Sequence, residues 1–217
     1  AGIIVGVVTL TGLGLKFSLI ILGLAGNNLF LTVLYTALSL WLLGLAVPVT
    51  ASYIIAAVIT APAMIKIGIP EYAAHMFIFY YAVLSEVSPP TALAPFAAAA
   101  ITGGSPYKTT MMAWKYTAPA FLVPFMFTLH PDGVGLLLKG EWSNILWTTA
   151  TAAVGLGALA AGLTGWLMIK ATVIERAILI AAGLVLVYPS LLQDAIGIGL
   201  FSLAGFLQYR RRRAAPV

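Results

Sequence analysis

The chain has 217 residues, of which 62% are hydrophobic and only 8% charged, and its formal net charge is +5 at pH 7. Soluble domains carry about 25% charged residues, so this composition cannot cover a surface that faces water. Together with a mean hydropathy of +1.06, it indicates an all-α integral membrane protein. The absence of cysteine excludes disulfides and thiolate metal sites.

The positive charge is concentrated near the C-terminus. Four of the eleven basic residues are consecutive, at Arg210 to Arg213, so the net charge does not predict a nucleic-acid partner. A short basic run beside a hydrophobic segment is typical of the cytoplasmic side of a membrane. We therefore expect a cytoplasmic C-terminal tail, the alternative being a solvated tail without topological meaning.

The chain opens with Ala1 and the apolar stretch "GIIVGVVTLTGLGL". It has no initiator Met, no charged n-region and no cleavage-site pattern, so this stretch is not a signal peptide. We expect the sequence to begin inside a larger protein whose missing part is needed for activity.

Residues 17 to 65 contain no charged side chain, and two turn signals interrupt them: "GNN" (Gly26 to Asn28) and "GLAVPVT" (Gly44 to Thr50). The apolar pieces Leu29–Leu43 and Ala51–Ile65 each have about fifteen residues. Each would reach about 22 Å, against a hydrocarbon core of about 30 Å. We predict a re-entrant hairpin over about residues 29–65, the alternative being two spanning helices with a tight loop.

A second interruption follows the polar connection Lys66 to Tyr72. The stretch "SEVSPP" separates an apolar piece at Ala73–Leu84 from another at Thr91–Ile101. Proline removes a backbone donor and clashes with the preceding turn, so this region cannot be one straight helix. We predict a broken helix over about residues 73–101.

The remainder of the chain is expected to be plainer. We predict a spanning helix over about residues 111–129, an interfacial connection at His130–Trp142, and a second span at Ile145–Ile169. The stretch "KATVIER" is expected to be a loop. Two short apolar segments follow, Ala177–Val187 and Ala195–Leu207, separated by "YPSLLQD". They could form one broken span, a hairpin or two tilted helices.

The composition changes near residue 130. Before it the apolar segments are repeatedly interrupted by Gly, Pro, Ser and Thr, and after it they are plainer hydrophobic stretches. We therefore expect the chemistry in residues 1–130 and a supporting C-terminal extension with a basic tail in residues 131–217.

The two interruptions point to ion chemistry. In lipid, non-helical backbone is tolerated only inside protein or beside a wet cavity. A break there exposes carbonyls and half-helix ends, whose C-terminal ends attract cations and whose N-terminal ends attract anions. Both breaks also carry hydroxyls, which suit a hard cation such as sodium. Taken together they predict a coupling-ion and substrate site, although each residue alone could mark a simple kink or a back-bonded hydroxyl. The hydroxyl residues are Thr50, Ser52, Ser85, Ser88 and Thr91.

Glu86 lies inside the second break. A buried acid costs several kcal/mol unless it is paired or protonated, so it could be an ion ligand, a proton carrier or a residue facing an aqueous vestibule. We expect His75 to be an interfacial histidine rather than its partner. No metal-ligand spacing, nucleophile elbow, phosphate loop or triad-like grouping is present, so the sequence does not predict an enzyme.

Several stretches resemble a known transporter family. They are "LGLAVPVTASYIIAAVITAPAMIKIGI", "AAHMFIFYYAVLSEVSPPTALAPFAAAAITG" and "YKTTMMAWKYTAPAFLVPFMFTLHP", supported by "AGIIVGVVTLTGLGLKFS" and "IERAILIAAGLVLVYPSLLQD". The match resembles the C-terminal half of the large membrane subunit of TRAP (tripartite ATP-independent periplasmic) transporters, in the fused form of that permease.

This resemblance implies a multi-pass protein of the bacterial inner membrane that imports an organic acid. The driving force would be a sodium gradient, or a proton gradient, coupled to an elevator movement of two inverted repeats. This chain would hold the second repeat, with a re-entrant hairpin and a discontinuous helix. Its partners would be the missing N-terminal half, a periplasmic solute-binding protein and a small membrane subunit or its fused equivalent. No cofactor is implied beyond the coupling ion.

The resemblance also places the family's second sodium site where the hairpin tip meets the break. Ala46 and Val49 depart from the family pattern, which has a glycine and a hydroxyl there, and Glu86 stands where a small apolar residue is usual. The alternative function is a structural or assembly module without its own ion site. The expected ion and substrate residues are Gly44, Ala46, Pro48, Thr50, Ser85, Glu86, Ser88, Pro89, Pro90 and Thr91, with Gly44, Thr50, Ser88 and Thr91 as sodium ligands.

Overall fold

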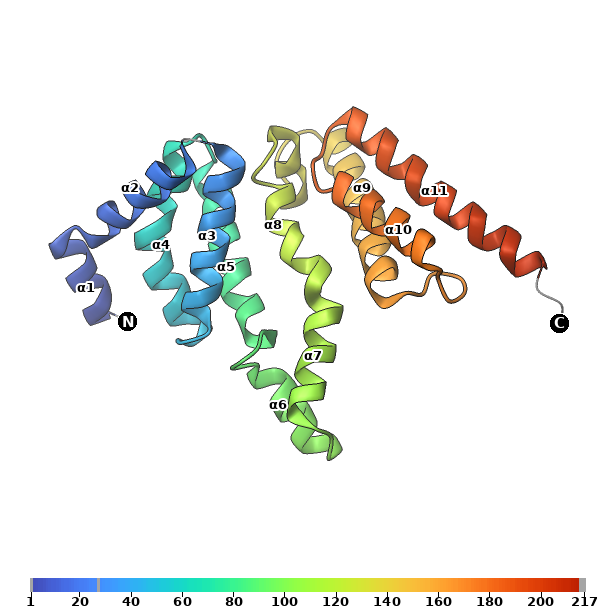
Figure 1. Cartoon of the computed structure of the whole chain (residues 1–217). Helices are drawn as coiled ribbons and strands as arrows, with labels where there is room; N and C mark the ends of the chain where they lie inside the picture. Colours follow the sequence, from blue (N-terminus) through green and yellow to red (C-terminus); the bar gives the residue numbers. More distant parts are fainter. Residues whose placement is uncertain (1, 27, 215–217) are drawn as a thin grey trace. The chain divides into compact units, whose positions relative to one another are not determined.

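The structure is a computed structural model that describes residues 2–26 and 28–214. Every regular element in these ranges is an α-helix or a 3₁₀ helix (Figure 1). The chain divides between Trp114 and Lys115 into two compact units, earlier than the boundary expected near residue 130. We call them unit 1 and unit 2.

Unit 1 begins with a bent pair of helices, with a 70° bend at Gly12, whose φ is +65°. The hairpin helices come next, followed by a helix that ends in a short 3₁₀ turn and by a final pair. The elements are α1 (Gly2–Thr11), α2 (Leu13–Ala25), α3 (Leu29–Gly44), α4 (Val49–Lys66), α5 (Glu71–Leu84), η1 (Ser85–Val87), α6 (Leu93–Thr102) and α7 (Pro106–Thr117).

Helices α3 and α4 occupy the two predicted hairpin arms. Asn28 caps α3, because its Oδ1 accepts a hydrogen bond from the N–H of Leu31 at 3.0 Å; Asn27 of the "GNN" signal lies outside the described residues. Helix α4 extends beyond the predicted arm at both ends and, with 18 residues and a mean hydropathy of 1.6, is long enough to cross a membrane. Helix α3 has 16 residues and is not among the helices long enough to cross, so length disfavours a spanning helix for α3 but not for α4.

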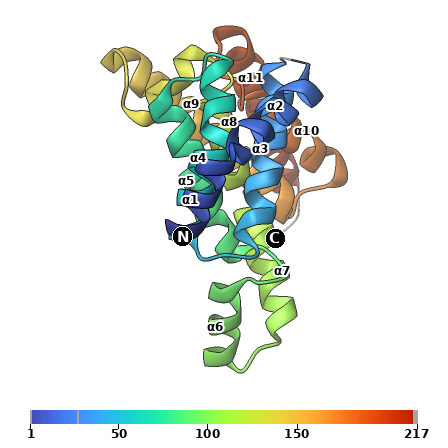
Figure 2. The same ribbon diagram turned by 90° about the vertical axis from the view of Figure 1, so that its left-hand side faces the viewer.

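The core of unit 1 is built on α5, which packs against both α3 and α4. Its face carries Phe77 and Ile78, which are fully buried with their small neighbours Ala73 and Ala74. Figure 2 shows α3, α4 and α5 side by side.

Helix α2 contacts α4 through backbone atoms. Pro62 lies inside α4 and has no N–H, so the Val58 carbonyl loses its helical donor. Gly14 of α2 faces that carbonyl so closely that a Cβ there would lie 2.9 Å from the Val58 oxygen. One turn further along, the Ser18 hydroxyl donates to the Ile59 carbonyl at 2.7 Å.

The prediction of one spanning helix over residues 111–129 is wrong. In its place α7 ends at Thr117, and two short elements follow it, η2 (Ala118–Leu122) and α8 (Val123–Met126). Pro119 and Pro124 lie at the start of these short elements. Each proline removes a helical donor and clashes with the turn before it, which accounts for the two breaks.

Unit 2 continues with η3 (Pro131–Leu137), α9 (Trp142–Thr164), α10 (Val173–Val185) and α11 (Leu191–Ala214). The expected interfacial connection thus contains a 3₁₀ helix. The span predicted at Ile145–Ile169 begins three residues earlier, at Trp142, and ends earlier, because Gly165 takes a left-handed conformation with φ +79°.

The predictions for the last part of the chain need two corrections. The second half of "KATVIER" is the first turn of α10, which Thr172 caps in a capping box with Glu175. The last apolar segment is longer than Ala195–Leu207, because α11 starts at Leu191 and includes all four arginines. It is therefore long enough to span, and the basic tail is helical.

Glycines bring the helices of unit 2 together. A Cβ on Gly183 of α10 would lie 2.3 Å from Cγ of Leu159 on α9, and one on Gly155 of α9 would lie 2.8 Å from Cβ of Leu186. On α11, a Cβ on Gly197 would lie 2.4 Å from Cγ of Leu186. Small residues of this kind let membrane helices approach closely.

Three described helices are long and apolar enough to cross a membrane: Val49–Lys66, Trp142–Thr164 and Leu191–Arg213. The bent pair α1 and α2 would add a fourth if it forms one span. The expected all-α membrane fold is confirmed at this level.

Candidate ion and substrate site

The two interruptions of unit 1 meet in space. A cavity of about 170 Å³ lies between the α3–α4 tip and the break after α5. The tip contributes Gly44 to Pro48, and the break contributes Ser85, Glu86, Thr91 and Leu93.

Gly44 sets the distance between the two segments. A Cβ at this position would lie 2.5 Å from Cβ and 2.6 Å from Oγ of Ser85. Real Cβ atoms do not approach this closely, so only glycine allows the last turn of α3 to rest against the start of η1. The cavity therefore depends on the absence of one side chain.

Several backbone oxygens at the site have no hydrogen-bond donor. Among the described residues, none donates to the carbonyls of Gly44, Leu45 and Ala46 at the tip, or to those of Pro89, Pro90 and Thr91 at the break. Proline contributes directly, since Pro48 has no N–H to offer Gly44. Unpaired carbonyls at membrane depth are tolerated where they line a wet cavity, and they are the groups that bind cations in broken helices.

Three serine hydroxyls in and beside the two interruptions, of which only that of Ser85 lines the cavity, donate hydrogen bonds to nearby backbone carbonyls. Ser85 Oγ donates to the Ala82 carbonyl at 2.7 Å, and Ser88 Oγ donates to the Leu84 carbonyl at 3.0 Å. Ser52 Oγ donates to the Val47 carbonyl at 2.8 Å. A hydroxyl whose proton is used elsewhere presents only lone pairs, which is the form in which it can bind a cation.

Four helix ends converge on the cavity. Helix α3 and the α5–η1 segment end there, while α4 starts just after Pro48 and α6 starts at Leu93. The C-terminal ends of α3 and of the α5–η1 segment carry partial negative charge, and the N-terminal ends of α4 and α6 carry partial positive charge. The site therefore offers groups for both a cation and an anion.

Glu86 lines the cavity and is half-buried. No described residue donates a hydrogen bond to its carboxylate or forms an ion pair with it. His75 interacts elsewhere, because its Nδ1 lies 3.0 Å from the hydroxyl of Tyr53. Glu86 is thus the one acidic side chain among the described residues that line the cavity.

Six of the ten predicted site residues line the cavity: Gly44, Ala46, Pro48, Ser85, Glu86 and Thr91. The other four, Thr50, Ser88, Pro89 and Pro90, are not in its lining. Thr50 is exposed on the first turn of α4, and Ser88 is fully buried behind the break. Sequence reasoning missed Leu45, Val47 and Leu93, which contribute backbone and apolar wall, although the first two lie inside the predicted interruption.

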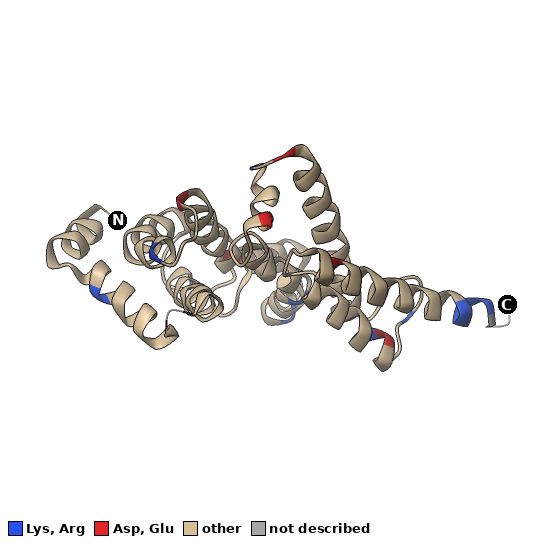
Figure 3. Cartoon of the chain, turned by 90° about the horizontal axis from the view of Figure 1, so that it is seen from above, with Lys and Arg blue, Asp and Glu red and all other residues tan. Residues whose placement is uncertain are grey.

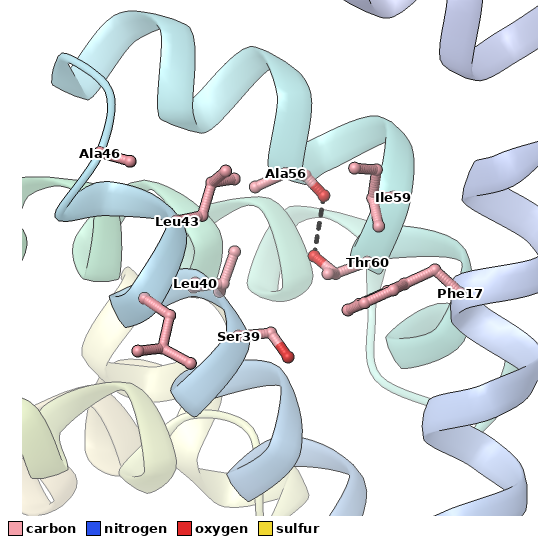
Figure 4. Close-up of a pocket in the computed structure, with 9 residues that line it drawn as sticks. Phe17, Ser39, Leu40, Leu43, Ala46, Ala56, Ile59 and Thr60 are labelled. Atoms are coloured by element: carbon pink, nitrogen blue, oxygen red, sulfur yellow. Dashed lines mark hydrogen bonds between the residues drawn. The ribbon is translucent and has the colours of Figure 1, made fainter.

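A larger apolar cavity of about 470 Å³ lies between α2, α3 and α4 (Figure 4). Its two polar side chains are satisfied within their own helices, Thr60 by the Ala56 carbonyl and Ser39 by the Tyr35 carbonyl. Ala46 lines both cavities. The larger cavity offers no unpaired polar side chain to a polar ligand.

Sequence analysis also missed a buried acid in unit 2. Asp194 is 3% exposed, and its Oδ2 accepts a hydrogen bond from Trp147 Nε1 at 2.8 Å. The signal was present, since an acid beside an apolar segment is expensive in a membrane unless it has a partner, but the sequence analysis placed this residue between two apolar segments without considering its charge.

The helical membrane fold, with two interrupted segments meeting at an oxygen-lined cavity, has the features of a membrane permease. The family of the tripartite ATP-independent periplasmic transporter, DctM component, matches residues 1–132, which is more than half of the chain. The chain belongs to this family of TRAP permeases, and the match includes both sides of the cavity. No curated protein and no solved structure matches the chain.

Membership establishes the class of the protein. The DctM component is an integral membrane permease of a secondary transporter that works with a binding protein and a small membrane subunit. The family is a transporter family rather than an enzyme family.

Proposed function

We propose that this chain is the second repeat and C-terminal extension of a fused TRAP permease that imports an organic acid with sodium. The observation that carries the proposal is the cavity where the two broken segments meet. The residues that line it carry unpaired backbone carbonyls, the hydroxyls of Ser85 and Thr91, and the Glu86 carboxylate, and such an oxygen-rich set suits a hard monovalent cation.

The organic acid is proposed from the opposite helix ends. The N-terminal ends of α4 and α6 reach the same cavity and attract negative charge. A carboxylate could therefore occupy a position beside the cation, and the two charges would neutralise each other in the membrane. The missing N-terminal half would complete the site, and a periplasmic solute-binding protein would deliver the acid.

The proposed arrangement has α3 and α4 as a re-entrant hairpin that moves with the discontinuous helix in an elevator transition. The protein would be located in a bacterial inner membrane, with the arginine-rich end of α11 in the cytoplasm.

The test uses the full-length permease with its small subunit and binding protein in proteoliposomes. Uptake of radiolabelled small organic acids is measured after a jump in external sodium, and after a proton jump as the comparison. We expect uptake to follow the sodium gradient. Uptake that ignores both gradients would contradict the proposal.

One observation favours a second candidate, a structural module without its own ion site. Ser88 is fully buried and back-bonded, and Thr50 lies outside the cavity lining. Replacing Ser85 and Thr91, the two hydroxyl residues that line the cavity, by alanine separates the two functions. Weaker sodium dependence in a normally folded double variant supports the ion site, and unchanged transport supports the structural module.

A further inference from the structure

Unit 2 concentrates its positive charge at one of its two ends. Because α9, α10 and α11 alternate in direction, residues 165–176 and the last turns of α11 lie at one end, and η3 with residues 186–194 lies at the other. Figure 3 shows basic residues gathered at the C-terminal end of α11. The first end, which we call the basic end, carries six basic residues and a single acid, Glu175. The six are Lys170, Arg176, Arg210, Arg211, Arg212 and Arg213.

The one acid of the basic end is neutralised internally. Glu175 is 5% exposed, and its Oε2 accepts from the N–H of Thr172 at 2.8 Å and from Gln208 Nε2 at 3.4 Å. The same oxygen forms an ion pair with Arg211 at 3.0 Å. Glu175 therefore balances Arg211 and does not offset the charges outside.

The same contacts hold the arginine run in place. Gln208 is fully buried, and its Oε1 accepts from the N–H groups of Met168 and Ile169 at 3.0 and 3.4 Å. Arg211 also donates to the Lys170 carbonyl. The last turns of α11 are thus fastened to the α9–α10 connection, which makes the basic end a built surface rather than a loose tail.

The remaining arginines of the run are exposed, and two of them lie beside aromatic rings. Arg210 lies 5.9 Å from the ring centroid of Phe206, and Arg213 lies 4.7 Å from that of Tyr209. Both rings are exposed, as is Trp166 on the neighbouring connection. Exposed aromatics with basic side chains at the end of a 23-residue apolar helix are typical of the membrane–water interface.

We propose that the basic end binds the phosphate groups of anionic membrane phospholipids. Charge complementarity supports this partner, because five exposed cations here have no carboxylate partner among the described residues. The apolar surroundings favour a lipid over a soluble acidic partner. Val173 and Ile174 start α10 at this end with 83% and 70% of their surface exposed, and only a bilayer would cover them while the headgroups meet the arginines.

The test is native mass spectrometry of the full chain with phosphatidylglycerol or phosphatidylcholine of the same acyl chains. The variant replaces Arg210, Arg212 and Arg213 by glutamine. The matched control replaces the same number of exposed cations in unit 1, at Lys16, Lys66 and Lys108. Because each basic residue near an anionic surface contributes about 1 kcal/mol, or roughly fivefold, we expect the arginine variant to lose on the order of a hundredfold preference for the anionic lipid. The lysine variant should keep it. An unchanged preference in the arginine variant, or an equal loss in the control, would overturn the proposal.

A second variant tests whether the contacts of Glu175 hold the arginine run in place for lipid binding, or whether the positive charge of the basic end alone accounts for it. Glu175→Gln removes the only acid of the basic end and so raises its net charge. Simple attraction would then give an equal or stronger preference for phosphatidylglycerol. A surface held in place by Glu175 instead predicts a weaker preference, because Arg211 loses its anchor. A weaker preference supports the proposal, and an equal or stronger one overturns the role of the anchor.

Discussion

Units 1 and 2 use the same small residues for opposite purposes. In unit 1, Gly44 lets the end of one helix rest against a break in another, so that unpaired backbone oxygens surround a cavity. In unit 2, Gly155 and Gly183 let continuous helices pack against each other's leucine side chains. A glycine in a membrane helix therefore does not by itself indicate flexibility or function. Its role depends on whether it packs against a break in another helix or against the side chains of a continuous one.

The polar groups differ in the same way. Unit 2 gives each of its buried acids a partner, Glu175 with Arg211 and Asp194 with Trp147, although the buried Oδ1 of Asp194 has no hydrogen-bond partner among the described residues. Unit 1 leaves Glu86 and six backbone carbonyls without a described partner. Unpaired polar groups in a membrane are expensive, and the six unpaired carbonyls lie in the part of the chain that the family match covers.

The largest expected effect comes from closing the contact at Gly44. Gly44→Ala places a Cβ within 2.6 Å of Ser85, which forces the tip and the break apart at a cost of about 1–3 kcal/mol. We expect sodium-driven uptake in proteoliposomes to fall at least about tenfold, since a misplacement of about 1 Å can cost a hundredfold. The control is Gly23→Ala, whose Cβ would meet no atom within 4 Å.

A double variant sharpens this result. Combining Gly44→Ala with Ser85→Gly removes both atoms that the new Cβ would meet, so uptake should partly recover. If Ser85→Gly brings no recovery, or if Gly44→Ala transports normally, the contact does not set the cavity.

The charge of Glu86 should have the next largest effect. Glu86→Gln keeps the shape of the cavity wall but removes its carboxylate, and a unit charge at about 4 Å is worth about 1 kcal/mol even in water. We expect the sodium concentration for half-maximal uptake to rise roughly fivefold, or the pH dependence of uptake to change. Glu71→Gln, on the exposed first turn of α5, is the control. If Glu86→Gln leaves both dependences as they are, Glu86 has no part in coupling.

In unit 2 the corresponding substitution should affect stability rather than transport chemistry. Gly183→Ala brings a Cβ within 2.8 Å of the Gly155 carbonyl oxygen, and backbone cannot move aside as a side chain can. We expect a loss of about 1–3 kcal/mol, measured as a lower Tm in detergent, with the sodium dependence of uptake retained. Gly157→Ala, which meets nothing within 4 Å, should be neutral or slightly stabilising. Equal Tm values for the two variants would contradict the close packing.

The smallest effect is expected at the start of α10. Thr172 Oγ1 accepts from the N–H of Glu175 at 3.3 Å as part of the capping box. Thr172→Ala should therefore cost about 1 kcal/mol of stability, whereas Thr172→Ser keeps the hydroxyl and should cost less. Thermal unfolding of the two variants measures the difference, and an alanine variant as stable as the serine variant would show that the cap contributes nothing.

The sequence predicted best where proline and glycine mark a boundary. Both arms of the hairpin and both halves of the broken helix lie within about two residues of their predicted bounds, because Pro48, Pro89 and Pro90 allow few alternatives. The same signal was present at Pro119 and Pro124, where the prediction of one spanning helix disregarded it.

Other features depend on contacts that a sequence pattern does not contain. The approach of Gly44 to Ser85 requires the register between two helices, which periodicity does not define. The arginine run resembles a solvated tail by composition, yet arginine is a good helix former. Gln208 and Arg211 are held by a connection about forty residues away in the sequence, so tertiary contacts decide the end of α11.

The contact between α2 and α4 determines which parts of unit 1 must move together. Pro62 opens the hydrogen-bond ladder of α4 at Val58, and α2 closes over it, with Gly14 against that carbonyl and Ser18 bonded to Ile59. If α4 slid along α2, the Ser18 bond would break and apolar lipid could offer no replacement donor. The contact therefore fastens α2 to α4. In the elevator movement proposed above, α2 would move together with α4, and the bend at Gly12 is the nearest interruption of the helix on the α1 side.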